Sequence, residues 1–285
     1  MFKEILRMKY NFKKKLFTTL LFVITGLTAA SQSYWQQAVD YKMDIDFNVE
    51  THQFSGSQTL TYTNNSPDTL SRVFYHLYFN AFQPGSMMDV RSRTISDPAS
   101  RVGDRISKLS DGEIGFHKVE SLTQDGKVLS YKTEGTVLEV TLVDPILPGA
   151  RSTFEMNFNS QVPLQIRRSG RDNKEGIDYS MAQWFPKMAE YDGRGWHAHP
   201  YVGREFYAPW GDFEVNITID KSYIIAGTGI LQNPNEIGYG YEDEGEKVKR
   251  KAKNLTWKFK AEKVHDFVWA ADPDYTHTKA QVPEG

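Results

Sequence analysis

The sequence predicts an all-β fold, built as saddle-like antiparallel sheets or a β-sandwich and preceded by an N-terminal signal-peptide helix. Apolar and polar residues alternate without a break from Tyr41 to Val49, the pattern of a strand with one buried face. Short segments of this kind recur and are separated by Gly, Pro and Asn, which form turns. No long segment after the N-terminus has the apolar spacing of an amphipathic helix.

The first two strands are predicted to form a hairpin. The strand that ends at Val49 is followed by a turn at Thr51-His52 and by a second strand over residues 53–63. Asn64-Asn65-Ser66-Pro67 then ends the pair, because Pro has no amide hydrogen for a strand ladder. The further predicted strands are residues 73–79, 116–122, 137–143, 153–158, 179–186, 213–219, 223–231, 255–260 and 266–271.

Three predicted loops are long for a compact domain: residues 84–115, 161–178 and 233–253. Loops of this length are often functional, so each is a candidate for contact with a partner surface. The roughly 255 residues that follow the signal segment fit one large all-β domain or two small ones.

Residues 1–30 have the pattern of a secretory signal peptide. Six basic residues precede an uncharged run from Leu16 to Ala30, and small residues place the cleavage site near Ala30. We expect the protein to be exported to the periplasm or the extracellular space. The apolar run is shorter than the ~20 residues that span a bilayer, so no stable membrane span is expected, with a permanent anchor as the alternative. The chain has no Cys and therefore no site for lipid attachment or a disulfide.

Charge excludes one class of partner. Removal of residues 1–30 takes away six positive charges and Glu4, so the formal net charge changes from −2 to −7. A chain this acidic is not expected to bind nucleic acid.

No motif in the sequence supplies a complete catalytic centre. There is no G-x-S-x-G, and a thiol enzyme is excluded because Cys is absent. His197 and His199 would share one face of a strand, but the sequence does not fix a third metal ligand, for which Asp192 and Glu205 are the nearest acids. We therefore predict no metal site here and a structural or surface role for both histidines.

Aromatic residues are concentrated between positions 184 and 210. Such a cluster either fills a core between sheets or lines a groove for peptides or sugars. Trp196 and Trp210 lie beside Gly and Pro in turn-like contexts, and we predict that they are the exposed members, whereas most of the others pack in the core.

The stretch from Gln183 to Thr218 resembles a known family. Its segments Gln183-Trp184-Phe185-Pro186-Lys187, Gly195-Trp196-His197, Glu205-Phe206-Tyr207 and residues 211–218 are similar to the N-terminal β-domain of the aminopeptidase N family of zinc metallopeptidases (gluzincins). The resemblance runs from about Ala38 to Tyr275 and is also carried by residues 75–81, 167–170 and 266–271. It implies a saddle-like β-domain over residues 31–275 that closes one end of the active-site cleft of a catalytic domain.

The resemblance also implies that the reaction centre lies elsewhere. The family holds its zinc with H-E-x-x-H and a downstream Glu, and no H-E-x-x-H occurs in these 285 residues. We therefore expect no cofactor in this chain, zinc in a missing catalytic domain, and no activity of the chain alone. Residues 276–285 would begin a linker to that domain, and the polar end is expected to be an interruption of a longer gene.

Gln183 is the one substrate-binding residue that the resemblance implies. Members of the family use a Gln, a Gln-x-Glu or a Gln-x-Gln on a late strand to help hold the free amino terminus of a peptide. Gln183 matches the first position, whereas the third is Phe185. A neutral amide offers an ammonium only a carbonyl acceptor, so either specificity is relaxed or an acid comes from the missing domain. The alternative is that Gln183 only pairs with neighbours in its strand.

These observations lead to two main hypotheses, and a degenerate, enzyme-derived interaction protein is a third alternative. The first is a non-catalytic N-terminal domain of an exported zinc metallo-aminopeptidase-like protein, with the catalytic domain and a peptide N-terminus as partners. The second is a stand-alone module that binds peptides or glycans through an aromatic surface around Trp196 and Trp210. Exposure of those two rings would favour the second.

Overall fold

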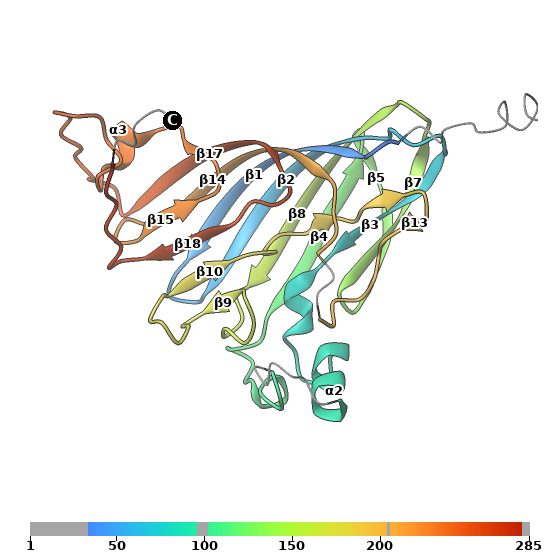
Figure 1. Cartoon of the computed structure of the whole chain (residues 1–285), viewed down its shortest axis with the longest axis horizontal. Helices are drawn as coiled ribbons and strands as arrows, with labels where there is room; N and C mark the ends of the chain where they lie inside the picture. The colour runs from blue at the N-terminus through green and yellow to red at the C-terminus, as the bar shows by residue number, and fades with distance from the viewer. Residues whose placement is uncertain (1–33, 96–101, 204–205, 281–285) are drawn as a thin grey trace, which may run out of the picture. The chain divides into compact units, whose positions relative to one another are not determined.

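An eight-stranded sheet is the largest element of the structure (Figure 1). The computed structural model describes residues 34–95, 102–203 and 206–280, so the predicted signal segment 1–30 lies outside the described residues. All helices and strands named in this section lie in one compact unit, Gln36–Gly285. The strand order is β16-β17-β14-β1-β2-β8-β4-β5. The bounds of these strands are β1 Ala38–Asn48, β2 Gln53–Thr63, β4 Phe116–Gln124, β5 Lys127–Val128, β8 Arg151–Gln161, β14 Trp210–Asp220, β16 Ile230–Leu231 and β17 Asn254–Val264.

Strand β1 joins distant parts of the chain within this sheet. It pairs antiparallel with β2, as the predicted hairpin requires, and parallel with β14 on its other side. The parallel register runs from Ala38 opposite Trp210 to Asp46 opposite Thr218. The other pairs in this sheet are antiparallel. The all-β prediction is therefore confirmed, with one parallel pair in a mainly antiparallel sheet.

Smaller sheets complete the described part of the unit. One four-stranded sheet has the order β15-β18-β10-β9, another has the order β11-β3-β7-β6, and β12 pairs with β13 alone. All of these pairs are antiparallel. The bounds are β3 Leu70–His76, β6 Ser130–Glu134, β7 Val137–Ile146, β9 Gly170–Arg171, β10 Tyr179–Met181, β11 Lys187–Met188, β12 Tyr191–Asp192, β13 Gly195–Trp196, β15 Ile224–Gly227 and β18 Trp269–Asp272.

The core follows from the alternation of side chains. Buried and exposed residues alternate along all of β1, so one face of the large sheet is apolar and the other polar. The apolar face packs with the small sheets in one hydrophobic cluster that includes Trp184, Trp257 and Trp269, none of which is more than 1% exposed. Burial of aromatic side chains of this size is a main source of stability, at about 25 cal/mol for each Å² of apolar surface.

Helices are short in the described residues. They are the 3₁₀ turns η1 (Tyr78–Ala81) and η2 (Ile106–Lys108) and the α-helices α2 (Met87–Thr94) and α3 (Pro234–Ile237). The predicted loop 84–115 thus contains α2 and η2, and Ser86 caps α2 by accepting a hydrogen bond from the Asp89 amide. In the described part of the chain, no helix combines the length and apolar character needed to cross a bilayer.

Several predicted strands have different limits in the structure, and the one predicted over 266–271 begins only at Trp269. The strand predicted over 73–79 ends at His76, where η1 follows. The one predicted over 223–231 divides into β15 and β16, with Gly229 between them at a φ of +85°. The one predicted over 179–186 ends at Met181, because Gln183 adopts a φ of +50° that a strand cannot continue through.

Candidate functional site

Gln183 lies in a tight bend between β10 and β11. Its φ of +50° is in the left-handed region, which costs a residue with a Cβ about 1 kcal/mol. The next two residues anchor the bend in the core. Trp184 and Phe185 are fully buried, and the Trp184 Nε1 donates to the Phe267 carbonyl at 3.0 Å. Strained backbone that is held in this way occurs often at functional sites.

The Gln183 side chain bonds to an acid from a different part of the chain. Its Nε2 donates to Oδ2 of Asp266 at 2.9 Å. The other carboxylate oxygen, Oδ1, accepts the Phe267 amide at 2.9 Å and lies 3.2 Å from the Lys187 ammonium. Among the described residues, the Gln183 Oε1 has no hydrogen-bond partner.

Lys187 balances the charge of Asp266 beneath the surface. Its side chain is 2% exposed and that of Asp266 is 12% exposed. The Lys187 Nζ also donates to the His265 carbonyl at 2.9 Å. Burial lowers the pKa of Lys187, and the charge and hydrogen bond of Asp266 partly oppose that shift. Loss of either partner would leave a buried charge without compensation.

Trp210 adjoins the same cluster. It is 51% exposed at the start of β14, and its ring centroid lies 5.6 Å from that of His265. Burial, and next the charge of Lys187, lower the pKa of the His265 imidazole. The structure therefore links the two predicted site residues Gln183 and Trp210 through the consecutive residues His265 and Asp266.

Trp196 lies in a different neighbourhood. It is half-buried in β13, and its ring contacts those of Tyr62, Phe74 and Tyr191 at centroid distances of 6.3, 5.6 and 5.1 Å. It packs against the main hydrophobic cluster and makes no ring contact with Trp210.

His197 and His199 lie close together after β13. Their ring centroids are 5.9 Å apart, and the His197 Nε2 lies 2.8 Å from Oδ1 of Asp192. Glu205, the other acid considered as a ligand, lies outside the described residues. Within the described ranges, no group of three or more His, Cys, Asp or Glu side chains is arranged to hold a metal ion.

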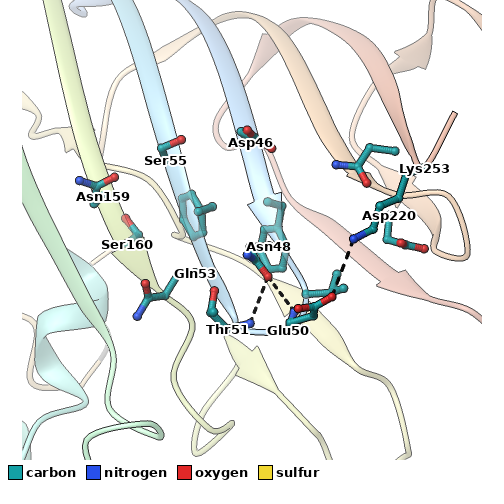
Figure 2. A pocket seen from close by; sticks show the side chains of 14 residues that line it. Asp46, Asn48, Glu50, Thr51, Gln53, Ser55, Asn159, Ser160, Asp220 and Lys253 are labelled. Carbon is teal, nitrogen blue, oxygen red and sulfur yellow. Dashed lines mark hydrogen bonds and ion pairs between the residues drawn. The ribbon is translucent and has the colours of Figure 1, made fainter.

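A polar hollow of about 490 Å³ lies elsewhere, at the turn between β1 and β2 (Figure 2). The Asn48 Oδ1 accepts the amides of Glu50 and Thr51 at 2.9 and 3.2 Å, which shapes the turn. The Lys253 Nζ lies 3.8 Å from the Glu50 carboxylate. Both of these charged side chains are about 80% exposed, so the pair contributes little stability.

Asp266 is the residue of the Gln183 cluster that sequence reasoning missed. It belongs to the segment 266–271 that carries part of the family resemblance, but no role was assigned to it. Its contact with Gln183 joins residues 83 positions apart. A single sequence contains no periodicity or motif that reports such a contact.

Comparisons with known proteins give matches among solved structures. No family model matches the chain, and no curated protein matches it. An M1 zinc metallopeptidase from Deinococcus radiodurans is 14% identical, with a TM-score of 0.43 and coverage of 82% of this chain and 42% of that one. A mutant from the same organism bound to a Tyr-Ser-Ala substrate is 16% identical, with a TM-score of 0.44 and the same coverage.

A mutant two-domain M1 zinc metallopeptidase bound to L-tryptophan is also similar. It is 14% identical, with a TM-score of 0.44 and coverage of 83% of this chain and 42% of that one. These three solved structures are M1 zinc metallopeptidases, and this chain spans less than half the length of each of them.

Proposed function

We propose that this chain contributes the non-catalytic N-terminal domain of an exported, aminopeptidase-like zinc metallopeptidase, and that Gln183 helps to hold the free amino terminus of a peptide. The observation that carries the proposal is the state of the Gln183 amide. Its Nε2 is bound to Asp266, while Oε1 has no partner among the described residues. An ammonium has three donors and no acceptor, so a free carbonyl oxygen suits it.

The residues around Gln183 also favour binding of a positively charged group, such as the ammonium of a peptide N-terminus. Asp266 places a carboxylate directly behind the amide, and a hydrogen bond from a charged donor is about twice as strong as a neutral one. The exposed ring of Trp210 adjoins the same cluster through His265 and offers an apolar face to the residue that carries the ammonium.

The remaining parts of the proposal follow from the family resemblance. Residues 1–30 would direct export, and the zinc, its ligands and the peptide-cleaving step would belong to a catalytic domain that docks on this one. The aromatic-module hypothesis would need Trp196 and Trp210 on one surface. Instead, Trp196 packs among Tyr62, Phe74 and Tyr191, and only Trp210 stands half exposed.

A binding experiment on the mature protein tests the role of Gln183. Calorimetry with Ala-Ala-Ala amide and with its N-acetylated form should show a preference for the free amine. Gln183→Ala should weaken binding of the free amine about tenfold, because one hydrogen bond to a charged group is lost. The matched control is Gln232→Ala, which truncates an exposed Gln outside the cluster. Equal affinity for both peptides, or no effect of Gln183→Ala, would refute the proposal.

An activity measurement tests the proposal that this chain is not catalytic by itself. The purified chain, supplied with zinc, should not hydrolyse aminoacyl reporter substrates. Turnover that a chelator abolishes would show that a reaction centre lies within this chain.

A further inference from the structure

We propose that Asp266 is a positioning residue that fixes which end of the Gln183 amide faces the ligand. In doing so it makes the site select a hydrogen-bond donor, such as an ammonium, over an acceptor, such as a carboxylate. The identity of the ligand rests on the proposed function, whereas the orientation of the amide does not.

The shape of the Gln183 amide does not by itself decide which end faces Asp266. Its NH₂ and C=O ends are nearly equal in size, so packing alone does not distinguish them. A carboxylate only accepts hydrogen bonds and can therefore engage only the NH₂ end. With Nε2 2.9 Å from Oδ2 of Asp266, the carbonyl oxygen must face away from that carboxylate.

Asp266 is itself immobilised. Its Oδ1 accepts the Phe267 amide at 2.9 Å and contacts the buried Lys187 ammonium at 3.2 Å. Lys187 is held in turn by the His265 carbonyl and by its place in β11, where it lies opposite His76 of β3. Oδ1 is thus held by two groups that are themselves fixed, and this anchoring keeps Oδ2 directed at Gln183.

The backbone beneath Gln183 is also constrained. A φ of +50° fixes the direction in which the side chain leaves the bend, and Trp184 locks that bend through the Phe267 carbonyl. Phe267 therefore contributes to both constraints, since its carbonyl holds Trp184 and its amide holds Asp266. A rigid support of this kind is what precise presentation of one acceptor requires.

The test variant is Asp266→Asn combined with Lys187→Met. The Asn keeps the shape of the side chain, but its NH₂ end can donate to the Gln183 carbonyl and so allow the Gln183 amide to flip. The Met removes the ammonium that would otherwise be buried without a full counter-charge. The matched control is Asp46→Asn, which neutralises an exposed acid on the solvent face of the large sheet. Near-ultraviolet circular dichroism verifies that each variant is folded.

Two measurements distinguish the orientation of the Gln183 amide from the binding of a ligand. The first is hydrogen exchange of the Gln183 side-chain amide in ¹⁵N spectra, assigned from the signals that Gln183→Glu removes. The second is the affinity for Ala-Ala-Ala amide relative to N-acetyl-Ala-Ala-Ala, which carries a carboxylate and no ammonium. In the wild type and the control, we expect slowed exchange and a preference for the ammonium probe. In the double variant, exchange should accelerate and the preference should fall about tenfold or reverse.

The results have distinct consequences. Side-chain exchange that is the same in the wild type and the double variant would overturn the positioning role of Asp266. An unchanged probe preference with altered exchange would overturn its role in selectivity. If exchange changes as expected and neither probe binds the wild type, the orientation stands and the proposed recognition of peptide amines fails.

Discussion

Glu190 should make the stability of this protein fall as pH rises, and Glu190→Gln should abolish that dependence. Glu190 lies between β11 and β12, is 3% exposed, and accepts a hydrogen bond from the Tyr191 amide at 3.2 Å. Desolvation raises the pKa of its carboxyl to about 7, the charge of Asp192 adds to the increase, and the Tyr191 amide opposes it.

The size of the effect follows from the difference between the folded and unfolded pKa values. The pKa rises from 4.5 to about 7, and each unit corresponds to about 1.4 kcal/mol, so the full effect is about 3 kcal/mol. Below pH 4.5 the Glu190 carboxyl is protonated in both the folded and the unfolded state, so it does not affect the free energy of unfolding. Between pH 4.5 and 7 the unfolded state loses its proton first, so the free energy of unfolding falls. Above pH 7 the carboxyl is ionised in both states, and the full destabilisation by the buried charge is present.

Urea denaturation at pH 5, 6.5 and 8, followed by tryptophan fluorescence, measures this effect. The free energy of unfolding of Glu190→Gln minus that of the wild type should increase by about 2 to 3 kcal/mol from pH 5 to pH 8. Other titrating groups are common to both proteins and cancel in the difference. Glu155→Gln, which removes an exposed acid of β8, should change stability by less than about 0.5 kcal/mol at each pH. A difference for Glu190→Gln that stays constant across the three pH values would refute the reasoning.

Three further predictions concern acid stability and packing. Burial lowers the pKa of His117 to about 3, so between pH 6.5 and 3 the imidazole binds a proton in the unfolded state but not in the folded state. The free energy of unfolding of the wild type should therefore fall by up to about 5 kcal/mol over this range. His117→Phe should lack this loss in urea titrations. A Cβ on Gly211 would lie 1.8 Å from the Val39 carbonyl oxygen, so Gly211→Ala should lower the melting temperature strongly, whereas Gly193→Ala, with no atom within 4 Å, should not. Equal melting temperatures would contradict this account of the β1–β14 contact. Phe185→Ala should cost about 3 to 5 kcal/mol, and Phe185→Glu should cost more because it buries a carboxylate; an unaltered denaturation midpoint in either would be inconsistent with the fully buried ring.

The parts of the fold that the sequence predicted correctly are those governed by neighbouring residues. The hairpin of β1 and β2 appears as expected, because alternation and turn chemistry are local properties. The parallel pairing of β1 with β14, by contrast, could not be predicted from local patterns. Alternation in two strands shows that each has one buried face, but it does not show which strands are neighbours or in which direction they run.

The incorrect strand end near Gln183 has a related cause. Residues 179–186 are rich in apolar and aromatic side chains, which favours a strand, and Trp184 and Phe185 are indeed fully buried. They reach the core from a bend and not from a strand, because the Trp184 indole bonds to the Phe267 carbonyl and Gln183 takes a positive φ. Apolar composition predicts burial, but it does not distinguish the backbone paths that achieve it.

The same limit explains why the acid beside Gln183 could not be found by motif. The family pattern directs attention to the residue two positions along, which is Phe185, and a side chain there faces the core rings of Tyr41 and Phe213. The carboxylate that touches Gln183 comes instead from Asp266, 83 residues later. A contact that depends on folding together two distant segments leaves no spacing to detect in one sequence. The departure at Phe185 is therefore compatible with a carboxylate beside Gln183, although Lys187 balances its charge, and the proposed selectivity would depend on how the segments at 183 and 266 are held together.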